Sequence, residues 1–370
     1  MPAPTENILV RGLNWLGDAV MSTPALIRLR QARPRARITL LSPEKLGGLW
    51  ARQPFVDQVL TFSSSENPWQ IGRRLRKESF TAGLIFPNSI RSALELWLAG
   101  VPERAGAARA GRSLLLTMAV PPLPGATPMR KRPPGEIRRR IQSGGGPALY
   151  PVTAHHVRHY LHLAAALGAS PEPVAPLLCV SGEEMEEARG KFALPPAAGR
   201  PWFGLNPGAE YGPAKRWPAD RFVAAALALR EKTRCRWVLF GGADDRALAE
   251  TIAGDIARAT GEPPLNLAGK TSLCELAAVL KICDLVLTND TGPMHLAAAV
   301  GAPVTAVFGS TSPELTGPVF SKRARVVRGQ APCAPCFRRQ CPIDLRCLRG
   351  IETAQVVAAA LDCLADASTQ

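Results

Sequence analysis

The 370-residue sequence has no apolar run approaching the ~20 residues that a membrane-spanning helix needs. Its first residues, MPAPTENILV, lack the basic region and apolar core of a secretory signal. Its nine cysteines are too few and too unevenly spaced for the disulfide framework of a secreted protein. We therefore expect a cytoplasmic chain, and an apolar content of 46% provides enough core for two domains.

Several motifs are also missing. No GxGxxG motif follows the first expected strand, so the sequence lacks the main evidence for a dinucleotide-dependent redox enzyme. No repeat with a period of 20 to 50 residues is visible, which argues against a solenoid. Aromatic residues make up only 6% and do not interleave with the basic runs, as they would in a single-strand nucleic-acid module.

Acidic residues are scarce in the first half of the chain. Residues 1–170 hold 23 Lys and Arg against 9 Asp and Glu, and the remainder holds 22 against 21. This asymmetry predicts that the first half meets an anionic partner, either nucleic acid or a membrane surface with phosphorylated lipid. The alternative is that single runs, such as RRLRK at 73–77, only solvate a helix face. Residues 121–147, rich in Pro, Gly and Arg, are expected to form a mobile basic loop.

Short apolar strands alternate with helical patterns, which is typical of an α/β fold with parallel sheets. Prolines interrupt the alternation at residues 170–176, and it then restarts. We therefore predict domains at residues 1–175 and 176–350, and a final helix at 351–370 that we expect to return to the first domain. The expected strands lie at residues 8–10, 38–41, 59–62, 84–86, 203–205, 237–240, 265–267, 285–287 and 304–308.

Residues 285–296, LVLTNDTGPMHL, combine an apolar strand, a turn and the start of a helix. Such a helix N-terminus offers backbone N–H groups and a positive dipole end to an anion. A second strand-end loop, in WFGLNPGAEYGPAKRWP at 202–218, ends in Lys215 and Arg216, so the two loops are suited to clamp a diphosphate. The alternative is that Asp290 or Thr291 caps the helix and Lys215 is a solvated surface charge.

Near the start, the first expected strand runs into the loop RGLNWLGD, where Gly12 and Gly17 place Asp18 at the carboxyl end of the strand. Ligands of open α/β sheets bind at this edge, so Asp18 is a candidate catalytic residue. Asp18 is equally a candidate N-cap for the helix that follows.

Three segments, in this order, resemble the lipopolysaccharide heptosyltransferases of glycosyltransferase family nine, most of all the type II members. They are GLNWLGDAVMSTPAL, PGAEYGPAKRWP and TNDTGPMHLAAAVGAPVTAVFGSTSP, and the resemblance spans residues 8–350. It implies two Rossmann-like domains facing across a cleft, the GT-B type, with the acceptor on the first domain and ADP-heptose on the second. It also implies an inverting transfer of L-glycero-D-manno-heptose to heptosyl-Kdo-lipid A, an anionic glycolipid at the inner face of the cytoplasmic membrane.

The resemblance assigns roles to individual residues. It implies that Asp18 is the general base and that Lys215 acts on the diphosphate of the donor. Donor-binding residues are implied at Gly208, Ala209, Lys215, Asp290, Thr291, Gly292 and His295, and acceptor-binding residues at Asn14, Arg130 and Arg138.

Three patterns bear on metals. The sequence has no DxD motif, and Asp244 and Asp245 are neighbours after an expected strand, so we predict a metal-independent reaction without a cofactor. Four cysteines lie close together near the end of the sequence: Cys333, Cys336, Cys341 and Cys347. We interpret them as a reduced structural cluster, with a zinc site as the minority hypothesis. The four histidines in 155–162 are interpreted as positions of an amphipathic helix, with contact to acceptor phosphates as the alternative.

Other functions remain open at this point. Within the enzyme class they are heptosyltransferase I or III and transfer of heptose to a protein. Outside it they are a nucleotide-binding scaffold and a nucleic-acid-binding protein. Asp18 distinguishes these classes, because only catalysis requires a base at that edge.

Overall fold

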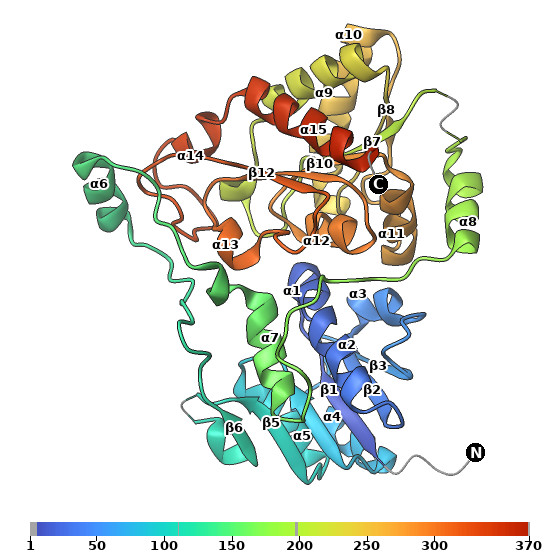
Figure 1. Cartoon of the computed structure of the whole chain (residues 1–370), viewed down its shortest axis with the longest axis vertical. Coiled ribbons are helices and arrows are strands. Elements are labelled where there is room, and N and C mark those ends of the chain that lie inside the picture. The colour runs from blue at the N-terminus through green and yellow to red at the C-terminus, as the bar shows by residue number, and fades with distance from the viewer. Residues whose placement is uncertain (1–5, 110, 197–198, 369–370) are drawn as a thin grey trace. The chain divides into compact units, whose positions relative to one another are not determined.

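The computed structural model describes residues 6–109, 111–196 and 199–368, and the chain forms two compact units. The first unit comprises residues 1–126 and 153–179, and the second comprises 127–152 and 180–370. In Figure 1 the first unit is blue to cyan with one green helix, while the second is mainly yellow to red.

The sheet of the first unit is parallel, in the order β3-β2-β1-β4-β5-β6. β1 has the sequence NILVR, and its last four residues are buried, as in a strand covered on both faces. The strand order reverses between β1 and β4, and this switch point is where open α/β sheets bind ligands. The strands are β1 (Asn7–Arg11), β2 (Arg37–Pro43), β3 (Gln58–Phe62), β4 (Ala82–Ile85), β5 (Glu103–Ala107) and β6 (Met118–Val120).

Helices cover this sheet, with α4 packed against α5 and α2 packed against α7. Between β1 and β2 the chain forms two helices divided at Ser22, because Pro24 lacks the N–H that would continue the first helix into the second. The α-helices are α1 (Leu16–Met21), α2 (Thr23–Ala32), α3 (Glu44–Gly47), α4 (Pro68–Leu75), α5 (Ile90–Leu98) and α7 (His156–Ala165). The short 3-10 turns are η1 (Gly48–Trp50), η2 (Arg76–Glu78), η3 (Ser113–Leu115) and η4 (Val152–Ala154).

The second unit repeats the same topology, with a parallel sheet in the order β12-β11-β10-β7-β8-β9. Its switch point lies between β7 and β10, whose residues are all buried. The predicted α/β class with two Rossmann-like domains is confirmed. The strands are β7 (Trp202–Asn206), β8 (Arg236–Leu239), β9 (Leu265–Asn266), β10 (Leu285–Asn289), β11 (Val304–Phe308) and β12 (Ala324–Arg328).

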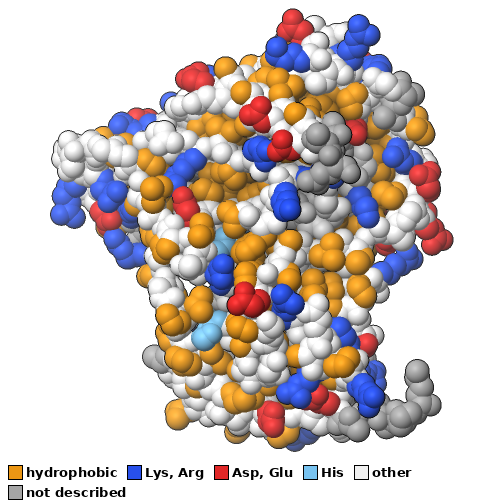
Figure 2. Space-filling model, in the orientation of Figure 1, with side chains coloured by type: hydrophobic (Ala, Val, Ile, Leu, Met, Phe, Trp, Pro, Cys, Tyr) orange, Lys and Arg blue, Asp and Glu red, His pale blue; other side chains and the backbone are white. Residues whose placement is uncertain are grey.

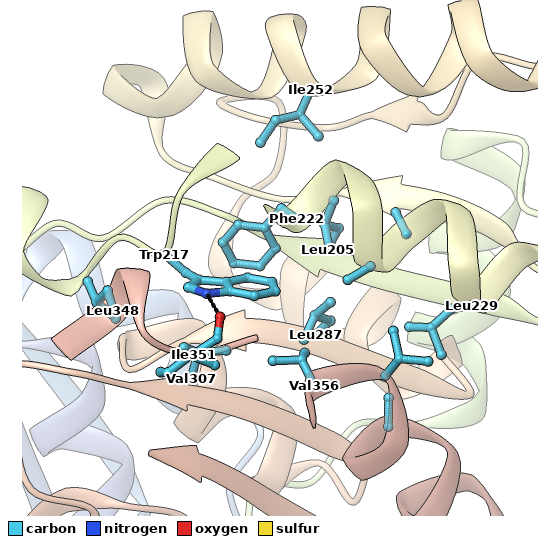
Figure 3. Close-up of a cluster of buried hydrophobic side chains, with 14 of the residues drawn as sticks. Leu205, Trp217, Phe222, Leu229, Ile252, Leu287, Val307, Leu348, Ile351 and Val356 are labelled. Atoms are coloured by element: carbon cyan, nitrogen blue, oxygen red, sulfur yellow. Dashed lines mark hydrogen bonds between the residues drawn. The ribbon is translucent and has the colours of Figure 1, made fainter. Parts of the chain in front are cut away.

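A large apolar core lies between this sheet and its helices (Figure 3). Trp217 packs edge-on against Phe222 with ring centroids 5.1 Å apart, and its indole N–H donates to the Ile351 carbonyl at 3.3 Å. The α-helices are α6 (Pro134–Ser143), α8 (Gly182–Phe192), α9 (Ala219–Thr233), α10 (Arg246–Thr260), α11 (Leu273–Ile282), α12 (Gly292–Ala299), α13 (Pro313–Thr316), α14 (Arg346–Arg349) and α15 (Thr353–Ser368). Two 3-10 turns complete the unit, η5 (Pro213–Lys215) and η6 (Ala243–Asp245).

The C-terminal helix corrects one expectation. α15, which we expected to return to the first domain, belongs to the second unit and packs there against α9, β11 and β12. Its apolar side chains explain the placement, because Val356, Ala360 and Cys363 are buried in the core of the second unit. No helix in the described part of the chain is both long enough and apolar enough to cross a bilayer.

The expected mobile loop at 121–147 is a second correction, because it contains α6 and most of it belongs to the second unit. Ile137 is buried in the core of that unit and Ile141 packs beside it. Arg132 is buried and donates to the Cys333 carbonyl at 3.0 Å. The basic segment is therefore docked through two isoleucines four residues apart and through hydrogen bonds to a loop about 200 residues later in the chain.

Candidate active site

Asp18 lies in the first turn of α1, directly after the loop that follows β1. Its carboxylate accepts a hydrogen bond from the Tyr160 hydroxyl at 2.9 Å, and His156 Nδ1 lies 3.6 Å from the same oxygen. The N-cap position of α1 is occupied by Trp15, so Asp18 is not the cap residue. The side chain of Asp18 is 31% exposed, which leaves it accessible to a substrate at the switch point.

Tyr160 is suited to hold this carboxylate in place. Burial, together with the charge of Asp18, raises the pKa of Tyr160 well above its ordinary value, so the hydroxyl stays protonated and donates. The ring is fixed by an edge-on contact with Phe86, with centroids 5.5 Å apart. On the same helix, burial and the neighbouring cations lower the pKa of His159 to about 4, so this imidazole is neutral at pH 7.

Asn14 is positioned by a buried ion pair at the end of β1. Arg11 Nε lies 2.7 Å from the Glu95 carboxylate, and both side chains are almost fully buried. The same guanidinium donates to the Gly12 carbonyl at 2.6 Å and to Asn14 Oδ1 at 3.2 Å. The loop that leads to Asp18 is thus held from its first residues.

In the second unit, the loop between β7 and α9 is held at both ends by one amide. Asn289, the last residue of β10, donates to the Pro207 carbonyl at 2.7 Å and accepts from the Trp217 N–H at 2.9 Å. A Cβ at Gly208 would be 2.3 Å from the carboxylate of Asp245, so a side chain there would require Asp245 to move. Asp245 accepts from Arg216 at 3.0 Å, whereas Asp244 is exposed.

This loop carries Lys215 to the carboxyl edge of the sheet. Lys215 Nζ is 2.6 Å from Asp290 Oδ2, and only 15% of the Lys215 side chain is exposed. Thr311, which follows β11, donates to the same carboxylate oxygen. Lys215 also lies over the ring of Tyr211, 5.1 Å from its centroid. Lys215 is therefore a partly buried cation in a formed site, and not a solvated surface charge.

α12 begins beside Asp290. Thr291 occupies its N-cap position, and within the described residues its side chain makes no capping hydrogen bond. Gly292 is the first helical residue, and His295 is buried one turn later. The N-terminal N–H groups and dipole of this helix therefore lie near the Lys215–Asp290 pair and favour an anion.

The structure brings the predicted residues into three groups. Asn14 and Asp18 lie at the switch point of the first unit, and the seven expected donor residues lie at or next to that of the second. Arg130 and Arg138 are exposed and belong to the second unit, which corrects their expected place on the first domain. Sequence analysis gave no role to four further residues that shape these sites: Tyr160, Tyr211, Asn289 and Thr311.

The cysteine loop supports the second site through its backbone. The Phe337 carbonyl accepts from the Tyr211 hydroxyl at 2.8 Å, and the Cys336 and Phe337 N–H groups donate to the Ser310 carbonyl. Burial raises the pKa of the Cys347 thiol to about 12, which suits a reduced structural residue. Across residues 6–109, 111–196 and 199–368, no three His, Cys, Asp or Glu side chains meet as a metal-binding group, so the geometry gives the zinc hypothesis no support.

Comparison with known proteins shows which family the chain resembles. The sequence model of glycosyltransferase family 9 (heptosyltransferase) matches residues 148–346. Lipopolysaccharide heptosyltransferase 2 of Escherichia coli K12 is 32% identical over 335 residues, covering 87% of each chain. Lipooligosaccharide heptosyltransferase 2 of Haemophilus ducreyi is 31% identical over 338 residues, covering 87% of this chain and 88% of the relative.

Among solved structures, that of E. coli ADP-heptose lps heptosyltransferase II has a TM-score of 0.77 at 28% identity, covering 98% of this chain and 99% of that one. The glycosyl transferase family 9 structure from Veillonella parvula has a TM-score of 0.74 at 22% identity, covering 99% of both chains, and shares the fold. From its motifs, its two Rossmann-like units and these relatives, the chain belongs to glycosyltransferase family 9, the heptosyltransferases.

Proposed function

We propose that this glycosyltransferase moves L-glycero-D-manno-heptose from ADP-heptose to heptosyl-Kdo-lipid A, with inversion at the anomeric carbon. The observation that carries the proposal is the cluster of Lys215, Asp290 and Thr311 at the N-terminus of α12. Its cation and helix dipole suit the diphosphate of a nucleotide sugar. The similarity to type II heptosyltransferases supports the choice of donor and acceptor.

In the proposed reaction, Asp18 takes the proton of the acceptor hydroxyl while that oxygen attacks the anomeric carbon of the donor. The bond from that carbon to the β-phosphate oxygen breaks, and ADP leaves with the bonding electrons. Lys215 and the N-terminus of α12 stabilise the charge that develops on the diphosphate. Asp290 orients the ammonium group, since its carboxylate lies 2.6 Å from Lys215 Nζ. These groups supply the charge stabilisation without a metal ion.

The proposed acceptor is an anionic glycolipid, so the enzyme would work as a peripheral protein at the inner face of the cytoplasmic membrane. The basic side chains around α6 support contact with this lipid, and Figure 2 shows Lys and Arg gathered over this region at the left of the view. Arg130 and Arg138 are the proposed acceptor contacts there, because both are exposed. Asn14 is the proposed contact beside Asp18.

The experiment offers ADP-heptose and a series of truncated core acceptors to the purified protein in excess chelator. Consumption of heptosyl-Kdo-lipid A, with release of one ADP per transfer, is the expected result. Preference for Kdo-lipid A or for a longer core would reassign the chain to heptosyltransferase I or III. Turnover that appears only with a protein acceptor, or only after magnesium is restored, would contradict the proposal. Binding of ADP-heptose without release of ADP with any acceptor would indicate a nucleotide-binding scaffold.

A further inference from the structure

Two tryptophans are exposed on neighbouring helices of the first unit. Trp69 in the first turn of α4 is 67% exposed, and Trp97 near the end of α5 is 48% exposed. The other sides of these helices are buried in the core of the first unit through residues such as Ile71 and Leu96. Exposure of an indole ring to water is unfavourable. Contiguous exposed apolar groups on a protein surface mark interaction sites.

The apolar surface continues along α5 and beyond it. Ile90, Leu94 and Trp97 lie at positions i, i+4 and i+7 of α5 and form one stripe, in which Ile90 is 54% exposed. The turn η3 packs against α5 and carries Leu114, which is 90% exposed. We call this surface the tryptophan face, formed by Trp69, Ile90, Leu94, Trp97 and Leu114.

Basic side chains lie on the same elements as the tryptophan face. Five lie on α4, η2 and α5 and are all exposed: Arg73, Arg74, Arg76, Lys77 and Arg91. Three acidic groups accompany them. Glu66 lies 3.4 Å from Arg74, Glu95 is fully buried against Arg11 and Arg91, and Glu78 is partly buried. The exposed charge around the face is therefore predominantly positive.

We propose that the tryptophan face docks on an anionic lipid bilayer. Tryptophan and arginine together favour the interfacial region of a membrane, where the ring lies at headgroup depth and the guanidinium reaches lipid phosphates. A basic cluster alone would give only a salt-sensitive attraction, and the apolar side chains add contact that salt does not screen. The complementary charge is what selects a bilayer as the occupant over an apolar protein surface.

The position of the tryptophan face fits the proposed function, and this part of the inference rests on that function. α4 and α5 follow β3 and β4, so both helices begin at the carboxyl edge of the sheet, where Asp18 lies. A chain of contacts joins the two places, from Arg91 to Glu95 at 3.1 Å, to Arg11 at 2.7 Å and to Asn14 at 3.2 Å. A lipid-anchored acceptor next to a docked tryptophan face would present its sugars near this edge.

The test measures binding of the full chain to vesicles of phosphatidylethanolamine with phosphatidylglycerol, against vesicles of phosphatidylcholine. We expect binding to the anionic vesicles only. Arg73→Gln with Lys77→Gln should weaken it about 30-fold at low salt, since each basic residue near the surface contributes about a fivefold factor. Trp69→Ala with Trp97→Ala should abolish the binding that remains at physiological salt. It should also abolish the blue shift of tryptophan emission that we expect when the wild type binds the anionic vesicles.

One matched double variant serves as the control. Arg35→Gln with Arg52→Gln removes the same charge from exposed positions elsewhere in the first unit, and should change binding little. Arg138→Gln with Arg139→Gln, the α6 variant, removes charge beside the proposed acceptor contacts and measures how much of the binding α6 contributes. Equal thermal midpoints for all variants would exclude misfolding, because these side chains are exposed.

Three outcomes would overturn the proposal. One is equal vesicle binding by the wild type and both variants of the tryptophan face. Another is release by the α6 variant alone. A third is no vesicle binding, with a dimer in solution that Trp69→Ala with Trp97→Ala dissociates. Turnover of a deacylated, water-soluble acceptor separates this inference from the proposed function, since the tryptophan variants should retain it.

Discussion

At the scale of single residues, Asp18 is the proposed general base and lies in the first unit. Asp18→Asn keeps the size and most hydrogen bonding of the side chain but removes its ability to accept the proton. We expect kcat to fall by on the order of 10² to 10⁴, while ADP binding changes little. Steady-state kinetics with ADP titration checks this. Near-normal turnover of the variant would remove Asp18 from the proposed chemistry.

Tyr160 is expected to position that base without touching the substrate. A hydrogen bond to the carboxylate favours its charged form, and the Tyr160 hydroxyl lies 2.9 Å from Asp18 Oδ1. Tyr160→Phe should therefore move the acidic limb of the kcat/KM profile to higher pH, because protonation of the base becomes easier. Loss of thermal stability without displacement of this limb would make Tyr160 a packing residue only.

Lys215 is paired with a carboxylate that is itself nearly buried. Lys215→Ala should lower kcat/KM by roughly 2 to 4 kcal/mol of transition-state stabilisation. It should also lower the free energy of unfolding by about 3 to 5 kcal/mol, since Asp290 is left as an uncompensated buried charge. Kinetics and denaturant unfolding measure the two effects. Lys232→Ala, at an exposed position of α9, is the control and should change neither.

Sequence patterns located some of these residues and missed others for a physical reason. Asp290 directly follows β10, and Asp18 and Lys215 lie in the segments that follow β1 and β7. All three are therefore found by the rule that ligands of open α/β sheets bind at the carboxyl ends of the strands. Tyr160 is separated from Asp18 by 142 residues, and Thr311 from Asp290 by 21. Their roles depend on contacts that only the folded chain creates.

At the scale of elements, most of the strands that were expected from the sequence contain a run of large apolar residues. β5, with the sequence ERAGA, β6, with MAV, and β12, with ARVVR, offer only short or small apolar stretches and were missed. α6 was missed because only Ile137 and Ile141 supply an apolar face among its arginines. The partner of that face lies in a loop far along the chain, so no local pattern could indicate the helix.

The docking of α6 leads to a prediction about stability. Ile137 is 1% exposed and belongs to the core of the second unit. Ile137→Ala should lower the free energy of unfolding by about 2 to 5 kcal/mol, as for other buried isoleucines. Arg138→Ala, its exposed neighbour, should change it little. Urea unfolding of both variants tests this, and an unaffected Ile137→Ala would restore the mobile loop that sequence analysis expected.

At the scale of the whole molecule, the charge asymmetry of the sequence is redistributed by the fold. The first unit holds 17 Lys and Arg against 9 Asp and Glu, and the second holds 28 against 21. Their net charges are therefore similar, because residues 127–152 carry their excess of arginine to the second unit. An anionic partner is therefore expected at particular surfaces, such as the tryptophan face, and not along one half of the chain.

Two compact units with one nucleotide site also predict how a ligand acts on the molecule. ADP should stabilise only the unit that binds it, by about 2.7 kcal/mol when ADP exceeds its dissociation constant 100-fold. Hydrogen exchange should then slow in β7, β10 and α12, while β1 and β4 exchange as before, because the expected donor residues all lie in the second unit. Lys215→Ala should reduce this protection and Asp18→Asn should preserve it. Protection by ADP that begins in β1 and β4 would place the nucleotide in the first unit and reverse the proposed assignment of the two sites.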